Sequence, residues 1–118
     1  MLWKDIMNKF NRDFGLNALQ EATAAAIAAT ELHLIRVGGD QYPCGFAWVN
    51  IKPARGPWVA LLKDIGMGYT DEYAGGYTIW NPSSNHCQNM DAKEAGARAF
   101  ADELGRHGLQ VSVGSRMD

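Results

Sequence analysis

Five side chains have the chemistry for nucleophilic or acid–base catalysis: Cys44, Cys87, His33, His86 and His107. A cysteine nucleophile needs a histidine within hydrogen-bonding reach and a third group that orients that histidine. His86 and Cys87 are adjacent in sequence, which does not aim their side chains at each other. We therefore predict a buried Cys44 before a strand and a loop Cys87, and we assign no catalytic residue. A small hydrolase or transferase that uses Cys44 or Cys87 with His86 is an alternative.

Metal and nucleotide motifs are incomplete. A zinc site usually has four Cys or His ligands in two close pairs, whereas His86-Cys87 is the only local cluster in this sequence. The glycines of 66–68 and 75–76 have neither a Walker spacing nor the G-x-G-x-x-G pattern after a strand. We predict no metal ligand and no cofactor.

Two further groups of residues are candidates for binding. Lys52, Arg55 and Arg116 could form a small cationic patch, and Tyr69 and Tyr73 lie in a segment rich in glycine. Exposed aromatic residues often dominate interfaces. Single-stranded nucleic acid is bound by aromatic residues with basic residues between them. Binding of such a strand through Tyr69, Tyr73 and Lys52 is therefore a second alternative, whereas the three tryptophans at 48, 58 and 80 are assigned to the core.

The hydrophobic spacing predicts four helices and four strands. The apolar residues of 3–14 form one helical stripe, which Gly15 ends, and Asn17 caps an alanine-rich helix over 18–30. Asp91 with Glu94 caps the last helix. The remaining helices cover 57–65 and 92–106, the segment 67–76 is a loop, and the strands cover 32–37, 46–51, 77–80 and 109–113.

This order, α-α-β-β-α-β-α-β, predicts an α+β two-layer sandwich with a mixed sheet of three or four strands. The chain of 118 residues suits one domain, with a helical pair over 1–30 and an α/β core over 31–118. Because helices join the last three strands, we expect parallel strands. Their carboxyl ends would then bring 52–55, 81–89 and 115–118 to one edge of the sheet, where open α/β sheets bind ligands.

Composition excludes some classes of protein. Acidic residues outnumber basic ones, 13 to 11, so nothing favours a duplex-DNA binder. The sequence has neither an export signal nor a run of roughly 18 to 20 apolar residues, which predicts a cytoplasmic protein with free thiols and no membrane partner. The alanine-rich helix allows a homodimer through the N-terminal helices.

Part of the sequence resembles a known group of proteins. The segments Cys44-Gly45-Phe46-Ala47-Trp48-Val49-Asn50-Ile51-Lys52-Pro53 and 93–101, with the ending Ser115-Arg116-Met117-Asp118, resemble small uncharacterised proteins encoded by tailed bacteriophages. The resemblance covers roughly residues 43 to 118 and carries no assigned activity. It implies a protein made in the cytoplasm of an infected bacterium, where small phage proteins often act on host machinery.

The sequence therefore favours a non-enzymatic, phage-type accessory protein. We expect it to bind a host macromolecule or to sequester a small anionic ligand at the edge formed by 52–55, 81–89 and 115–118. The expected contact residues are Lys52, Arg55, Tyr69, Tyr73, His86, Gln88 and Arg116.

Overall fold

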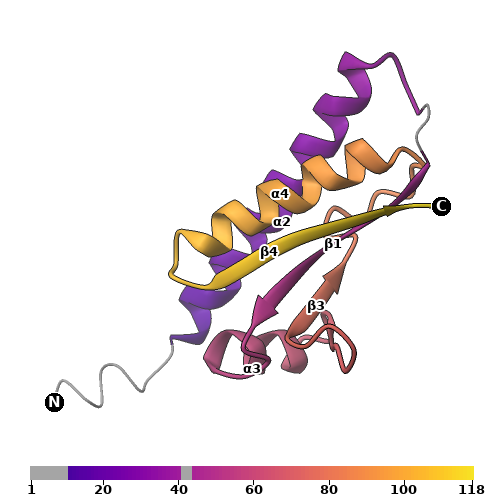
Figure 1. The fold of residues 1–118 in the computed structure, drawn as a ribbon. Coiled ribbons are helices and arrows are strands. Elements are labelled where there is room, and N and C mark those ends of the chain that lie inside the picture. The colour runs from indigo at the N-terminus through magenta and orange to yellow at the C-terminus, as the bar shows by residue number, and fades with distance from the viewer. Residues whose placement is uncertain (1–10, 41–43) are drawn as a thin grey trace, which may run out of the picture.

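The computed structural model describes residues 11–40 and 44–118, so most of the helix expected over 3–14 lies outside the described residues. The elements are α2 (Arg12–Arg36), β1 (Gly45–Lys52), α3 (Pro57–Asp64), β2 (Tyr69–Thr70), β3 (Tyr77–Trp80), α4 (Met90–Gly105) and β4 (Gln110–Met117). The α+β class is confirmed (Figure 1).

Helix α2 is longer than the sequence pattern indicated. Asn11 caps it by accepting a hydrogen bond from the Phe14 amide at 3.1 Å, and the helix continues through Gly15 and Asn17. The break predicted at Gly15 is wrong because burial of this glycine compensates for its poor helix propensity, which costs about 1 kcal/mol. The strand predicted over 32–37 is also wrong, since good helix formers extend the alanine-rich segment until Gly38, where φ is +81°.

The four strands are in the order β2-β3-β1-β4, and every neighbouring pair is antiparallel. Helices α3 and α4 do connect parallel strands, β1 with β2 and β3 with β4, but an antiparallel strand lies between the members of each pair. This β-α-β-β-α-β arrangement is the ferredoxin-like topology. The expected mixed sheet is wrong because β2, only two residues long, lies within the segment predicted to be a loop. Omitting one strand reverses the inferred direction of the next.

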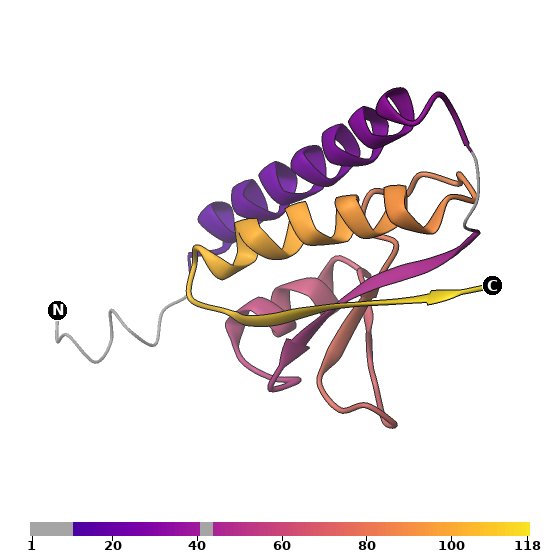
Figure 2. The same cartoon turned by 45° about the horizontal axis from the view of Figure 1, so that its top comes forward.

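The three helices of the described residues lie on the same side of the sheet, and α2 covers the outer side of α4 (Figure 2). The core between helices and sheet contains aliphatic residues of β1 and α3 with Tyr77 and Phe100. Helices α2 and α4 approach closely through small residues, because a Cβ atom at Gly96 would overlap the Thr30 hydroxyl oxygen. That hydroxyl donates a hydrogen bond to the Ala92 carbonyl at 3.0 Å. One side of the alanine-rich helix therefore packs into the core.

The N-cap of helix α4 lies two residues before the expected one. Asn89 is the N-cap and accepts a hydrogen bond from the Ala92 amide at 2.8 Å. Asp91 lies within the first turn, so its assignment as the cap is wrong. The Asp40 carboxylate accepts hydrogen bonds from the amides of Gln88 and Asn89, both at 2.8 Å, and thereby links the end of α2 to the start of α4.

Candidate functional site

The face of the sheet that no described helix covers carries large aromatic side chains. Strand β1 directs Ala47, Val49 and Ile51 into the core, so Phe46 and Trp48 alternate onto the opposite face. Trp80 lies directly opposite Trp48 in the antiparallel register and is 44% exposed. The assignment of Trp48 and Trp80 to the core is therefore wrong. Which face the helices cover depends on tertiary structure, although the alternation in β1 is visible in the sequence.

Phe46, Trp48 and Trp80 form one aromatic cluster. The ring centroids of Trp48 and Trp80 are 5.3 Å apart and the ring planes differ by 4°, which is a parallel stack. Phe46 lies 5.5 Å from Trp80 with its ring tilted by 37°. Aromatic pairs in such contacts stabilise each other by about 0.5–1.5 kcal/mol beyond the burial of their area. The cluster thus forms an aromatic platform on an open sheet.

The Trp48 ring packs on the backbone of Gly114 in the neighbouring strand β4. A Cβ atom at this position would overlap the Trp48 indole at Cε2 and Nε1. Glycine is therefore required by the close approach of the ring and not by an unusual backbone angle. The Trp48 ring of the aromatic cluster therefore packs directly against the backbone of β4.

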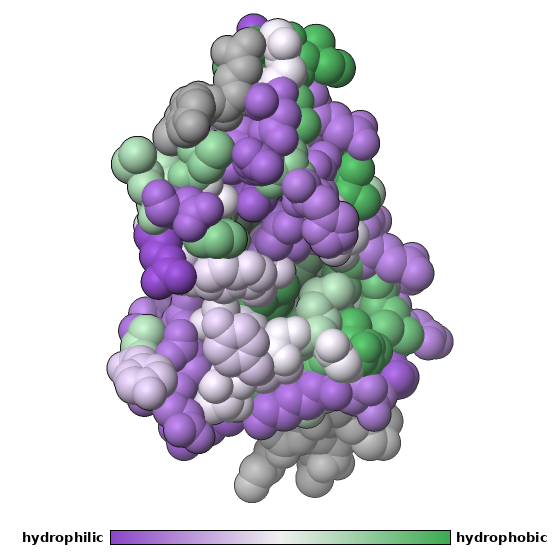
Figure 3. Space-filling model, turned by 90° about the vertical axis from the view of Figure 1, so that its right-hand side faces the viewer, coloured by the Kyte–Doolittle hydropathy of each residue, from purple (hydrophilic) through white to green (hydrophobic). Residues whose placement is uncertain are grey.

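Two cations flank the cluster at the end of the sheet where β4 finishes. The Arg116 guanidinium carbon is 5.6 Å from the centre of the Phe46 ring, and the Lys93 ammonium is 5.2 Å from it. Lys93 also donates a hydrogen bond to the Gly45 carbonyl at 3.0 Å. Arg116 is exposed and forms no ion pair with any described residue. Figure 3 shows a side of the molecule with pale side chains, rings among them, near its centre, hydrophobic side chains directly beside them and hydrophilic side chains along much of its margin.

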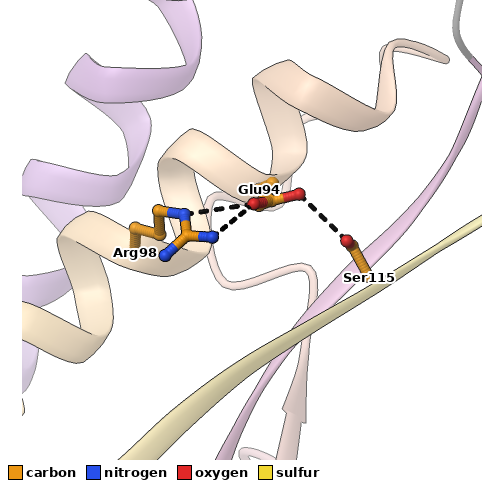
Figure 4. Close-up of polar contacts among 3 residues, drawn as sticks. All are labelled: Glu94, Arg98 and Ser115. Carbon is orange, nitrogen blue, oxygen red and sulfur yellow. Dashed lines mark hydrogen bonds and ion pairs between the residues drawn. The ribbon is translucent and has the colours of Figure 1, made fainter.

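The end of β4 that carries Arg116 is anchored to α4. The Glu94 carboxylate accepts a hydrogen bond from the Ser115 hydroxyl at 2.9 Å and pairs with the Arg98 guanidinium at 2.6 Å (Figure 4). Hydrogen bonds from Arg98 and Ser115 lower the pKa of Glu94. Glu94 therefore acts as a link between helix and sheet and not as part of a capping box with Asp91.

The other end of the open face is polar. Lys52 ends β1, and Tyr69 of β2 lies opposite Thr78 in the register and is 49% exposed. The Thr78 hydroxyl contacts the Asp71 carboxylate at 3.3 Å, and the backbone amides of the β2–β3 hairpin, Ala74 first, lower the pKa of Asp71. Tyr73 is fully exposed in that hairpin.

The expected three-segment edge is only partly assembled. The segments 81–89 and 115–118 do meet at one end of the sheet, since Cys44 bridges to Asn89 and its carbonyl accepts from the Asp118 amide at 3.0 Å. Residues 52–55 lie at the opposite end, because Lys52 is opposite Gln110, the first residue of β4. Arg55 is therefore at the other end of the sheet from Arg116. His86 and Gln88 are exposed in the loop that follows β3.

The cysteines lack the surroundings of a nucleophile. Burial, and secondarily the nearby Asp40 carboxylate, raise the pKa of the Cys87 thiol, which opposes thiolate formation. The Cys44 sulfur lies 3.7 Å from the Gln88 amide oxygen, and within the described residues no hydrogen bond joins His86 to either thiol. Both thiols are free. The structure gives no support to the cysteine-dependent alternative.

The described parts of the chain contain neither a cluster of metal-ligating side chains nor a membrane-spanning helix. Residues 11–40 and 44–118 contain no group of three or more His, Cys, Asp or Glu side chains placed to hold a metal ion. None of the described helices has the length and apolarity needed to cross a bilayer. No protein-family model matches the sequence, and comparison with curated proteins and with solved structures finds no match.

Proposed function

We propose that this protein is a non-enzymatic binding protein whose open sheet face binds an unpaired nucleic-acid strand. The observation that carries the proposal is the stack of Trp48 and Trp80 on the helix-free face, beside Phe46 and next to Arg116 and Lys93. Unpaired bases stack on aromatic side chains, and a four-stranded sheet with exposed aromatic residues on its inner strands accommodates two or three bases in known RNA-recognition modules.

The dimensions and charges of the face suit such a ligand. From Phe46 to Lys52 the strand β1 extends for about 20 Å, with Phe46, Trp48 and Lys52 on the same face. Lys93 and Arg116 lie at one end and Lys52 at the other, so cations are available to phosphates on both sides of the aromatic cluster. Tyr69 adds a further exposed ring beside β3.

This ligand also agrees with the weakly acidic composition. A protein that neutralises many phosphates needs a basic surface, whereas one that gains its affinity from stacking needs few cations. Contacts from Lys52, Lys93 and Arg116 would give a slope of about −2 in a plot of log affinity against log salt, at roughly −0.7 per phosphate on a single strand. The phage resemblance and the cytoplasmic location stay predictions; a host transcript would be one source of unpaired strand.

The experiment is a fluorescence titration of the full chain with oligouridylate, oligothymidylate and a duplex of equal length. Bases that stack on indole rings quench tryptophan emission, so we expect saturable quenching by the unpaired oligomers and little by the duplex. Trp80→Ala should weaken binding by about fivefold to more than a hundredfold, since stacking of one base is worth about 1–3 kcal/mol.

The matched control is Phe14→Ala. Phe14 is 49% exposed, close to the 44% of Trp80, but it belongs to α2 on the helical side of the molecule. Because tryptophan emission could change in Trp80→Ala itself, affinities of the variants are measured with a fluorophore on the oligonucleotide. Absence of binding at low salt, or equal losses in Trp80→Ala and Phe14→Ala, would refute the proposal.

A further inference from the structure

Helix α2 has an uncovered apolar side. From Ala22 to Thr30 the sequence has no charged residue, and helices that are apolar all round are normally covered all round. In this structure Ala22, Ala26 and Thr30 pack inward, toward α4. The opposite side of the helix is directed away from α4 and the sheet (Figure 2).

The uncovered side has the spacing of a helix-pairing surface. Ala25, Ala28, Leu32 and Ile35 follow one another at intervals of three, four and three residues, which places them on one face of a helix. Leu32 is 47% exposed and Ile35 is 76% exposed, both high for large aliphatic side chains. We call this surface, together with the charged residues at its ends, Glu21 and Arg36, the outer α2 face.

The charges at the two ends are opposite and available. Glu21 lies four residues before Ala25, and Arg36 lies four residues after Leu32. Both side chains are exposed, and neither forms an ion pair with a described residue. Fifteen residues of α-helix separate them by about 22 Å. A surface with an acid at one end and a base at the other is complementary to a reversed copy of itself.

We propose that the outer α2 face pairs with the same face of a second copy of the chain, with the two helices antiparallel. A two-fold axis between Ala28 and Ala29 places each Glu21 opposite Arg36 of the second copy, and each Leu32 opposite Ala25. Small residues then face large ones and the helix backbones approach closely. A parallel pair would instead bring two Glu21 and two Arg36 side chains together, so the charges select the antiparallel pair.

This dimer forms reversibly. We expect a contact confined to about four turns of one helix to bury less surface than the roughly 800 Å² per partner of a standard stable interface, and therefore to be weak. The proposal does not rest on nucleic-acid binding, because the outer α2 face and the open sheet face are on opposite sides of α4. Self-association is therefore measured on the full chain without any ligand.

The test is sedimentation velocity over a wide range of protein concentration. We expect a shift from monomer to dimer as concentration rises. Arg36→Glu and Glu21→Arg should each raise the dimer dissociation constant at least about tenfold, because each turns two attractive pairs into two repulsive ones. The double variant Glu21→Arg with Arg36→Glu restores both pairs and should return the dissociation constant to within a few-fold of the original.

Two further variants locate the interface. Ala28→Glu places two carboxylates at the two-fold axis and should abolish the dimer. Glu72→Arg makes the same charge change as Glu21→Arg at an exposed position of the β2–β3 hairpin, away from α2, and should leave the dimer intact. Circular dichroism verifies that each variant keeps its helix content. A chain that stays monomeric at all concentrations, a dimer that survives Ala28→Glu, or failure of the double variant to recover would overturn the proposal.

Discussion

Replacing Gly96 with alanine probes how closely α2 and α4 approach each other. In an open helix interior, alanine is favoured over glycine by about 1 kcal/mol. At Gly96 the added methyl group would overlap the Thr30 hydroxyl and approach the Ala26 carbonyl oxygen to 3.1 Å. The backbone carbonyl cannot rotate away, and movement of the Thr30 hydroxyl breaks its buried hydrogen bond to Ala92.

The magnitude follows from these three effects. Overpacking costs about 1–3 kcal/mol, and loss of the Thr30 hydrogen bond costs about 0.5–1.5 kcal/mol. After the gain in helix propensity of about 1 kcal/mol, we expect Gly96→Ala to lower the free energy of unfolding by about 0.5–3.5 kcal/mol. For a domain of this size that lowers the melting temperature by roughly 3–6 °C per kcal/mol.

Gly105 provides the matched control on the same helix. A Cβ atom there meets only the Val111 side chain, at 3.9 Å. Gly105→Ala should therefore raise the free energy of unfolding by a few tenths to about 1 kcal/mol. Urea denaturation of both variants measures the difference. If Gly96→Ala stabilises the protein as much as Gly105→Ala does, the close α2–α4 packing described above is incorrect.

Three further predictions concern the site and its supports. Because the folded pKa of Glu94 is lowered, its contribution to stability is complete above the unfolded pKa of about 4.3 and is lost as pH falls from there through the lower folded pKa. In urea denaturation, Glu94→Gln should therefore be less stable than the original chain at pH 7 and equally stable in strong acid. The pKa of the Cys87 thiol is raised. In a Cys44→Ser variant, Cys87 should therefore react slowly with a disulfide reagent at neutral pH and faster only in alkali. A fast reaction at neutral pH would restore the enzyme hypothesis. Gly114→Ala should displace the Trp48 ring and change the near-ultraviolet circular dichroism of the stacked indoles. Ser112→Ala, an exposed change on the same strand, should leave that spectrum unchanged. A Gly114→Ala spectrum identical to that of the original chain would contradict the stacking.

Much of the fold was predictable from local patterns. The helices near 57–65 and 92–106 and the strands at 46–51 and 77–80 have clear periodicity, and the structure confirms them. The two-residue strand β2 has no periodicity to detect, and its omission led to the wrong strand directions. The strand expected over 32–37 is wrong because Leu32, Leu34 and Arg36 are good helix formers that extend α2.

The candidate site was harder to predict than the fold. Arg116, Lys52 and Tyr69 were named from their charge or loop position, and the structure places them beside the open sheet face. Trp48 and Trp80 were assigned to the core because a strand pattern separates two faces without indicating which one the helices cover. That information comes from the side on which α3 and α4 cross the sheet, a tertiary property of the whole unit.

The order of the layers has a consequence for valency. Helix α2 lies above α4, and the sheet lies below α4 (Figure 2). The aromatic face of the sheet is the one turned away from α4. Two copies joined through α2 would therefore direct their aromatic faces away from each other, on opposite surfaces of the assembly. A single short strand could not reach both faces at once, whereas two strands, or two distant segments of one long strand, could each occupy one. Such a dimer would act as a cross-linker, and its avidity would depend on the length of the nucleic acid and not on the affinity of either face alone.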